Sequence, residues 1–354
     1  MLIVDTFSEI HDLIEPITDR EFWDFSKETI VPGAIYVIGR QQMIDNTEQI
    51  MELVNNNVIK VVFSNPHEGS DTIRSHIIQY GIAELALAGK IIIVGGGDMS
   101  AEWPCLQYES FLPKLLDYTE NRSAAKSAVD VYSNTNKPYK FLFLNGRGRK
   151  HRRYLINRFT ENNLLEKALW TNLDSNIAPI HYLPAKYEVN RYQEQVGIES
   201  QTHYAKFDLF SNEWGEIYLT PAPYVDTYFS LVSETVFEYP YSFRTEKIWK
   251  PVVMQHPWIA VANRGYYRDM HNLGFKTFGH LIDESFDTID NNQDRLEQIA
   301  RVVEDLSSSN LPAFLAAAED TSKYNYQHYQ IMRHRVRAEF PDRFKQFTKK
   351  YFNE

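Results

Sequence analysis

The chain has 354 residues, of which 43% are hydrophobic and 14% aromatic, so two domains of about 150 residues each are expected. Its formal net charge of −10 argues against indiscriminate binding to nucleic acid or anionic lipid. The single Cys105 excludes an internal disulfide. The sequence has no apolar run of roughly 18 residues, and it does not start with basic residues followed by an apolar run. A cytoplasmic protein without a membrane span is therefore expected.

Residues 1–135 alternate between strand-like and helix-like patterns. Short apolar runs rich in β-branched residues predict strands at 34–38, 58–63 and 91–94. Helical spacing predicts helices at 47–54 and 71–87, the second ended by Gly89. This alternation predicts a parallel sheet with helices on its faces, whose ligands meet the loops after the strands.

The two loops after these strands, 64–70 and 95–100, hold candidates for a general base. His67 and Glu68 lie on the first, and Asp98 on the second, where three glycines before it would allow a substrate to approach the backbone. The alternative is that each of them caps the helix that follows. Asp71 fits a helix N-cap better than a base.

A second domain is expected to begin after the polar stretch 119–138, which suits an interdomain linker. A strand at 140–144 leads into a helix with apolar Leu155, Ile156 and Phe159, and further strands are expected at 217–219, 228–232 and 258–261. The predicted division is an N-terminal domain at 1–135, a second domain at 136–320, and a basic helical segment at 321–354.

The last segment, 321–354, carries eight basic and three acidic residues, a net of +5, whereas the rest of the chain has a net of −15. Such a segment could meet a polyanion. The simpler interpretation is that it docks on the acidic body of the protein.

The loop after the strand at 140–144 is strongly basic. Five of the seven residues from Arg147 to Arg153 are Lys or Arg, directly before a predicted helix N-terminus. Backbone amides, the helix dipole and guanidinium groups all favour phosphate there, although a solvated basic turn is the alternative. The pattern is not a Walker loop, because G-x-x-x-x-G-K-[ST] is absent.

A second cluster of charged residues comprises Glu234 and the segment 242–250. Thr245 can cap a helix that starts at Glu246. Arg244 and Lys247 could then supply positive charge to a diphosphate at the helix N-terminus, while Glu246 accepts hydrogen bonds from ribose hydroxyls. Ordinary helix capping is the alternative.

The stretch from Glu234 through the segment Ser242-Phe243-Arg244-Thr245-Glu246-Lys247-Ile248 to the segment 257–261 resembles the donor-site signature of fucosyltransferases and related GT-B glycosyltransferases. The start of the second domain, with Asn145, a loop, and Arg152 on a helix, is similar too. The resemblance implies that Arg152 and Lys247 hold the diphosphate and that Glu246 holds the ribose. The family usually has an asparagine near the acidic residue, where this chain has Ser233 and Thr235 beside Glu234.

The resemblance covers residues 140–290. The segments 273–278 and 283–287 look most like uncharacterised phage and marine viral proteins. The resemblance therefore predicts a GT-B-like α/β fold, with two Rossmann-like domains whose parallel sheets face each other across a cleft. It implies that the first domain is the acceptor side and that the second binds a nucleotide sugar. The donor site would comprise Asn145, Arg147, Arg152, Glu234, Arg244, Thr245, Glu246 and Lys247.

The predicted activity is transfer of a sugar from a nucleotide-sugar donor to a hydroxyl acceptor, either a glycan or a hydroxymethylated base in phage DNA. No metal site and no cofactor are expected, because the sequence lacks metal-ligand motifs and cationic side chains would neutralise the leaving diphosphate. The alternative is a non-catalytic nucleotide or nucleic-acid binding module with a degenerate donor site. A dinucleotide-dependent oxidoreductase fits poorly, since Ser100 stands where G-x-G-x-x-G needs its last glycine.

Overall fold

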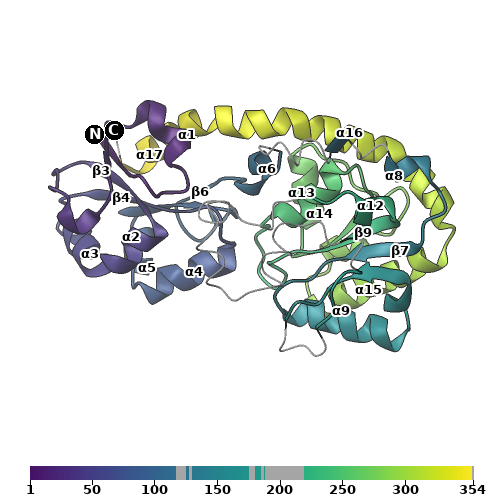
Figure 1. The fold of residues 1–354 in the computed structure, drawn as a ribbon. Coiled ribbons are helices and arrows are strands. Elements are labelled where there is room, and N and C mark those ends of the chain that lie inside the picture. The colour runs from purple at the N-terminus through teal and green to yellow at the C-terminus, as the bar shows by residue number, and fades with distance from the viewer. Residues whose placement is uncertain (117–124, 127–129, 175–179, 185–186, 188–218, 353–354) are drawn as a thin grey trace. The chain divides into compact units, whose positions relative to one another are not determined.

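The computed structural model describes residues 1–354 except 117–124, 127–129, 175–179, 185–186, 188–218 and 353–354. The fold is α/β, with two separate sheets of parallel strands (Figure 1). The chain forms two compact units. Unit 1 comprises Met1–Pro113, Tyr241–Phe243 and Met332–Glu354, and unit 2 comprises Lys114–Pro240 and Arg244–Ile331.

The sheet of unit 1 has six strands in the order β2-β1-β3-β4-β5-β6, all parallel to their neighbours. These strands are β1 (Leu2–Asp5), β2 (Arg20–Phe22), β3 (Ile35–Gly39), β4 (Lys60–Asn65), β5 (Ile91–Gly95) and β6 (Cys105–Gln107). The predicted strands at 34–38, 58–63 and 91–94 correspond to β3, β4 and β5. The short strands β1, β2 and β6 were not predicted.

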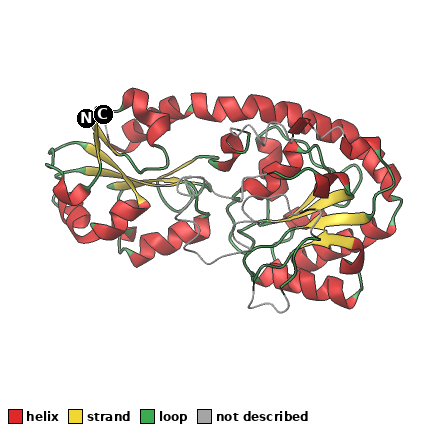
Figure 2. Cartoon of the chain, in the orientation of Figure 1, coloured by secondary structure: helices red, strands yellow, loops and turns green. Residues whose placement is uncertain are grey.

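The central strands β3, β4 and β5 are mainly apolar and almost fully buried because both faces of the sheet are covered. Ile91 and Ile93 point into one core cluster, while Ile92 and Val94 point into another. Figure 2 shows helices beside the strands of each unit. The helices of unit 1 are α1 (His11–Ile14), α2 (Arg40–Asp45), α3 (Thr47–Asn55), α4 (Ser70–Gln79), α5 (Ala83–Leu87), α6 (Phe111–Lys114) and α17 (Phe340–Phe352), with 3₁₀ turns at Glu15–Ile17 and Phe25–Lys27.

The predicted single helix at 71–87 is wrong, because the structure divides it into α4 and α5. Gly81 between them has φ of 68°, a left-handed conformation that ends the first helix. Gly89 has φ of 69° and ends α5 as predicted. Asp71 is not an N-cap: Gly69 holds that position, and Asp71 lies in the first turn of α4.

The C-terminal helix α17 docks on unit 1 through aromatic side chains. Phe340, Phe344 and Phe352 are buried in the same cluster as Ile92 and Val94. The segment therefore covers one face of the sheet mainly by hydrophobic packing, not by the charge attraction that its composition suggested.

The sheet of unit 2 has four strands in the order β10-β9-β7-β8, again all parallel. They are β7 (Tyr139–Phe143), β8 (Ala168–Trp170), β9 (Thr227–Ser233) and β10 (Trp258–Val261). The predictions at 140–144, 228–232 and 258–261 correspond to β7, β9 and β10. The prediction at 217–219 falls largely outside the described residues.

The helices of unit 2 are α8 (Asp130–Ser133), α9 (Lys150–Glu161), α12 (Ala222–Val225), α13 (Glu246–Val253), α14 (Tyr266–Asn272) and α15 (Asn292–Ser308), with 3₁₀ turns at Leu165–Lys167 and Ser285–Thr288. The long helix α16 (Leu311–Ala338) belongs to unit 2 up to Ile331 and to unit 1 from Met332. As the sequence predicted, α9 buries Leu155, Ile156 and Phe159. Within the described part of the chain, no helix is both long enough and apolar enough to cross a membrane.

Candidate functional site

The candidate site lies at the carboxyl edge of the sheet of unit 2. The chain passes from β7 outward to β8 on one side and from β9 outward to β10 on the other, so the strand order reverses between β7 and β9. The loops after these two strands diverge, and parallel sheets bind their ligands at such reversals. The helices α9 and α13 follow these two strands, and the predicted donor residues lie on these helices and on the segments that lead into them.

Glu234, directly after β9, joins the end of that strand to the start of α13. Its side chain is fully buried. Oε1 accepts hydrogen bonds from the Thr245 backbone N–H at 3.2 Å and from the Tyr266 hydroxyl at 3.0 Å, and Oε2 accepts one from Thr245 Oγ1 at 2.7 Å. Burial raises the pKa of Glu234, against the opposing charge of Lys247. This carboxylate therefore sets the position of Thr245.

Thr245 is the N-cap of α13, as the sequence predicted. Its Oγ1 accepts the Lys247 backbone N–H at 3.3 Å. The Lys247 ammonium donates to Thr245 Oγ1 at 3.2 Å and to Glu246 Oε1 at 2.7 Å, and the lysine side chain is 28% exposed. Burial would raise the pKa of Glu246, but the charges of Lys247 and Lys250 outweigh burial and hold that pKa below its ordinary value. The first turn of α13 thus holds an ionised carboxylate and a partly exposed ammonium.

Arg152 and His151, in the first turn of α9, both donate to the backbone carbonyl of Glu234. Arg152 Nη2 reaches Ser233 O at 2.8 Å and Glu234 O at 3.3 Å, and His151 Nε2 lies 3.0 Å from Glu234 O. Burial, followed by the charge of Arg149, lowers the pKa of Arg152 to about 10. Burial and the charge of Arg152 lower the pKa of His151 to about 3, so this imidazole is neutral near pH 7.

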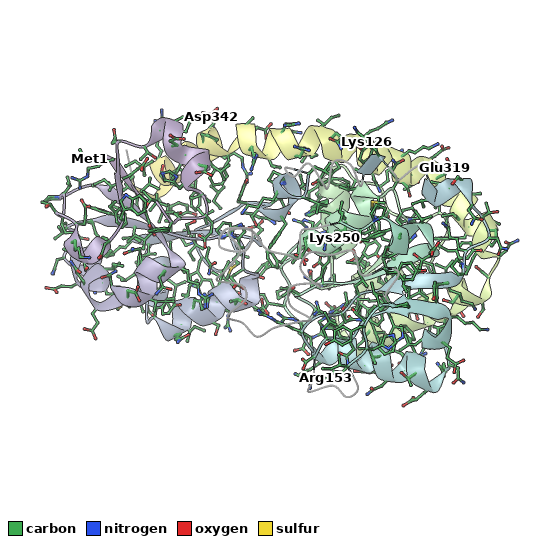
Figure 3. All side chains as sticks on the ribbon, viewed as in Figure 1. Met1, Lys126, Arg153, Lys250, Glu319 and Asp342 are labelled. Atoms are coloured by element: carbon green, nitrogen blue, oxygen red, sulfur yellow. The ribbon has the colours of Figure 1, made fainter. Side chains whose placement is uncertain are left out.

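Every nitrogen of the Arg152 guanidinium is already engaged. Nε donates to Ser233 Oγ at 3.3 Å and Nη1 to Arg147 O at 2.8 Å, in addition to the two contacts of Nη2. The side chain is only 3% exposed. Arg152 therefore holds the end of β9 and the loop after β7 together. The exposed cations of this loop and helix are Arg147, Lys150 and Arg153, the last of which is labelled in Figure 3.

Asn145 lies at the carboxyl end of β7, beside the strand reversal. Its N–H donates to Thr171 Oγ1 at 2.8 Å, and its Nδ2 approaches Phe143 O at 3.4 Å. Its Oδ1 is buried, and no donor within the described part of the chain reaches it. A buried acceptor of this kind calls for a donor from a bound molecule or water. Arg244, which precedes the cap of α13, is also buried.

The predicted base residues lie in unit 1, at the carboxyl edge of its own sheet. His67 is half-buried with its ring 5.6 Å from that of Phe111, and Glu68 lies 3.6 Å from the Arg40 guanidinium. Asp98 is exposed and accepts the Ser100 N–H at 3.0 Å, which forms an Asx turn. The next helix, α4, has Gly69 as its N-cap and no side-chain cap, so neither His67 nor Glu68 caps it.

Other residues of unit 1 fill the space that the missing side chains of the glycines before Asp98 would occupy. A Cβ on Gly96 would lie 2.4 Å from the Phe243 ring and 2.7 Å from Pro66 O, and one on Gly97 would lie 3.3 Å from Ser242 O. Ser242 and Phe243 therefore occupy the space on the Cβ side of Gly96 and Gly97, and close approach of a substrate to this backbone stays a prediction. Ser242 and Phe243 belong to unit 1, whereas the rest of their motif, from Arg244 onward, belongs to unit 2.

Two partners of the site were missed. Tyr266 reaches Glu234 from 32 residues further along the chain, and no local pattern marks such a contact. His151 lies in the basic loop, where its neighbours suggested charge although burial makes it neutral. Among the described residues, no group of three or more His, Cys, Asp or Glu side chains could hold a metal ion.

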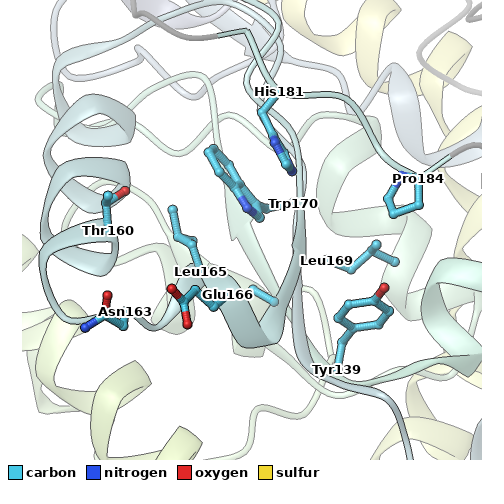
Figure 4. A pocket seen from close by; sticks show the side chains of 10 residues that line it. Tyr139, Thr160, Asn163, Leu165, Glu166, Leu169, Trp170, His181 and Pro184 are labelled. Atoms are coloured by element: carbon cyan, nitrogen blue, oxygen red, sulfur yellow. The ribbon is translucent and has the colours of Figure 1, made fainter.

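A separate pocket of about 430 Å³ lies along the edge strand β8 (Figure 4). Trp170 and His181 stack at its rim, with ring centroids 4.0 Å apart. Thr160 and Asn163 line it from the end of α9 opposite to the basic loop, so the pocket is distinct from the candidate site.

A scan against protein-family models, a search of curated proteins and a search of solved structures each found no match to this chain.

Proposed function

We propose that this protein is a glycosyltransferase of GT-B architecture, which moves a sugar from a nucleotide-sugar donor to a hydroxyl acceptor and binds the donor in unit 2. The two parallel sheets are compatible with that architecture. The observation that carries the proposal is the junction at the strand reversal. There the buried Glu234 fixes the N-cap Thr245, and the first turn of α13 presents Lys247 beside Glu246.

In this proposal the diphosphate of the donor binds at the N-terminus of α13. Backbone N–H groups and the helix dipole favour an anion there. Lys247 adds a full positive charge, and the exposed Arg147 can add a second. These charges stabilise the nucleoside diphosphate most strongly as it leaves, when its negative charge grows.

Two residues of the predicted site take more specific roles in the proposal. Arg152, whose nitrogens all donate to protein oxygens, is a positioning residue that orders the basic loop, and it is not a direct diphosphate ligand. Glu246 stays ionised and can accept hydrogen bonds from ribose hydroxyls. Asn145 Oδ1, a buried acceptor that no described donor reaches, can accept one from the donor substrate.

The transfer itself joins the acceptor oxygen to the anomeric carbon of the sugar, while the bond from that carbon to the diphosphate oxygen breaks. The acceptor hydroxyl loses its proton to a base, and the nucleoside diphosphate leaves with the bonding electrons. His67, Glu68 and Asp98 are the candidate bases.

The test is release of nucleotide from a panel of UDP, GDP, ADP and CMP sugars, measured by chromatography without and with acceptors. We expect slow release from at least one donor. Lys247→Ala should lower that rate by roughly thirty-fold to a thousand-fold, because a charge-assisted contact to the leaving group is lost. The matched control is Lys167→Ala, an exposed lysine just before β8, which should keep the wild-type rate.

Binding of a nucleotide without any release would instead indicate a binding module. Equal rates in wild type and Lys247→Ala, with folding intact by circular dichroism, would exclude the α13 N-terminus as the donor site.

A further inference from the structure

Phe7 and Trp23 form an exposed aromatic pair on unit 1. Phe7 is 64% exposed and Trp23 67%, and their ring centroids are 5.1 Å apart with the planes at 84°. An aromatic side chain normally buries much of its area, so two adjacent rings this exposed mark a surface that can bind another molecule.

The pair lies where an α/β sheet binds ligands. Phe7 follows the carboxyl end of β1, and Trp23 follows that of β2, the neighbouring parallel strand. The strand order β2-β1-β3 reverses between β1 and β3, so β1 borders the reversal in this sheet as β7 does in unit 2.

The backbone around both rings is held by specific hydrogen bonds. The Thr6 N–H donates to Phe22 O at 3.0 Å, which ties the end of β1 to the end of β2. The Phe7 N–H donates to the buried Asp5 at 3.0 Å. Gln42 Nε2 donates to Trp23 O at 2.9 Å. The rings therefore project from a fixed frame, which reduces the entropy lost when they bind a ligand.

The charge of this region identifies the kind of ligand. Residues 1–30 carry eight acidic side chains and two basic ones, a net of −6. Both bases are already paired, Arg20 with Glu28 and Lys27 with Asp24. A polyanion such as DNA would be repelled and would find no free cation in this stretch.

A neutral saccharide suits the same surface. The apolar C–H face of a sugar ring packs on an aromatic face, and its hydroxyls can donate to carboxylates around it. Asp12 and Glu21 supply such acceptors, with side chains 98% and 44% exposed.

We propose that Phe7 and Trp23 are the stacking surface for a neutral saccharide, which is the acceptor of the transfer. This inference rests on the proposed function, and it selects a glycan over a modified base in DNA as the acceptor.

The experiment measures binding of the full chain, without any donor, to an array of neutral oligosaccharides, followed by saturation-transfer NMR on the best ligand. We expect binding, with the saturation concentrated on the C–H protons of one sugar face. Trp23→Ala and Phe7→Ala should each raise the dissociation constant for the saccharide by roughly ten-fold to a hundred-fold. Trp23→Phe should retain most of the affinity.

The matched control is Leu87→Ala, which removes a 60% exposed apolar side chain from α5 of the same unit and should leave binding unchanged. A 20-nucleotide single-stranded DNA probe, followed by fluorescence anisotropy, is the competing ligand. No binding to any neutral glycan, equal saccharide affinity in wild type and Trp23→Ala, or DNA binding that depends on Trp23 would each overturn the proposal.

Failure here is distinguishable from failure of the proposed function, because the two assays use different ligands. Nucleotide release that depends on Lys247, without saccharide binding at Trp23, would refute only the acceptor surface. Saccharide binding at Trp23 without nucleotide release from any donor would refute the transferase, and with it the acceptor role, but not the saccharide-binding surface itself.

Discussion

Replacing Glu234 by Ala tests whether this buried carboxylate organises the candidate site. The substitution removes the acceptor of three hydrogen bonds, from the Thr245 N–H, the Thr245 hydroxyl and the Tyr266 hydroxyl. The site is fully buried, so water does not readily replace the carboxylate. The start of α13 then loses its anchor to the end of β9.

The expected loss in the free energy of unfolding follows from these contacts. Each buried donor that loses its acceptor costs about 1–3 kcal/mol. Removing the carboxylate also relieves its own burial penalty, which is the reason its pKa is raised. The net loss should be about 2–4 kcal/mol.

Two variants separate the contributions. Tyr266→Phe removes one donor together with its hydrogen bond, and should cost about 1 kcal/mol. Glu234→Gln keeps the shape and one acceptor oxygen, so its loss should lie between those of Tyr266→Phe and Glu234→Ala. Urea-induced unfolding followed by circular dichroism measures the free energy of unfolding of all three variants. The comparison requires that the slope of this free energy against urea concentration is the same in wild type and variants. A Glu234→Ala protein within about 0.5 kcal/mol of wild type would refute the reasoning.

Two further predictions concern packing and pH. Gly96→Ala forces a Cβ against the Phe243 ring and should lower the free energy of unfolding by about 1–3 kcal/mol. In the control Gly146→Ala, the added Cβ meets nothing within 4 Å, so the free energy of unfolding should change by less than about 0.5 kcal/mol. Equal effects of the two variants in urea unfolding would contradict the packing of Phe243 on Gly96. Burial raises the pKa of Glu284 to about 7. Between about pH 4.5 and 7, the Glu284 carboxyl therefore stays protonated in the folded state and is ionised in the unfolded chain. The stability that this group contributes is fully present below about pH 4.5 and is lost as the pH rises through 7. Glu284→Gln should flatten this part of the stability profile, by up to about 3 kcal/mol, in unfolding measured from pH 4 to 8; an unchanged slope would exclude Glu284 as its source.

The predictable part of the fold came from local patterns. Long apolar runs rich in β-branched residues marked β3, β4, β5 and β9, and the N-cap Thr245 was recognisable from its own neighbours. The three-residue strands β2, β6 and β8 have no such signal, because a run that short does not distinguish a strand from a loop.

The sequence by itself predicted which segments form the candidate site, since a capping threonine followed by Glu246 and Lys247, and a basic loop before a helix, are local features. Only the tertiary structure decided what each charge does. Arg152 turns inward to the carbonyls of Ser233 and Glu234 because the parallel pairing of β7 and β9 brings residues more than eighty positions apart to one edge. Glu234 meets Tyr266 because β10, which precedes Tyr266, pairs in parallel with β9. Burial and the partners of a side chain depend on such long-range pairing, which no local pattern encodes.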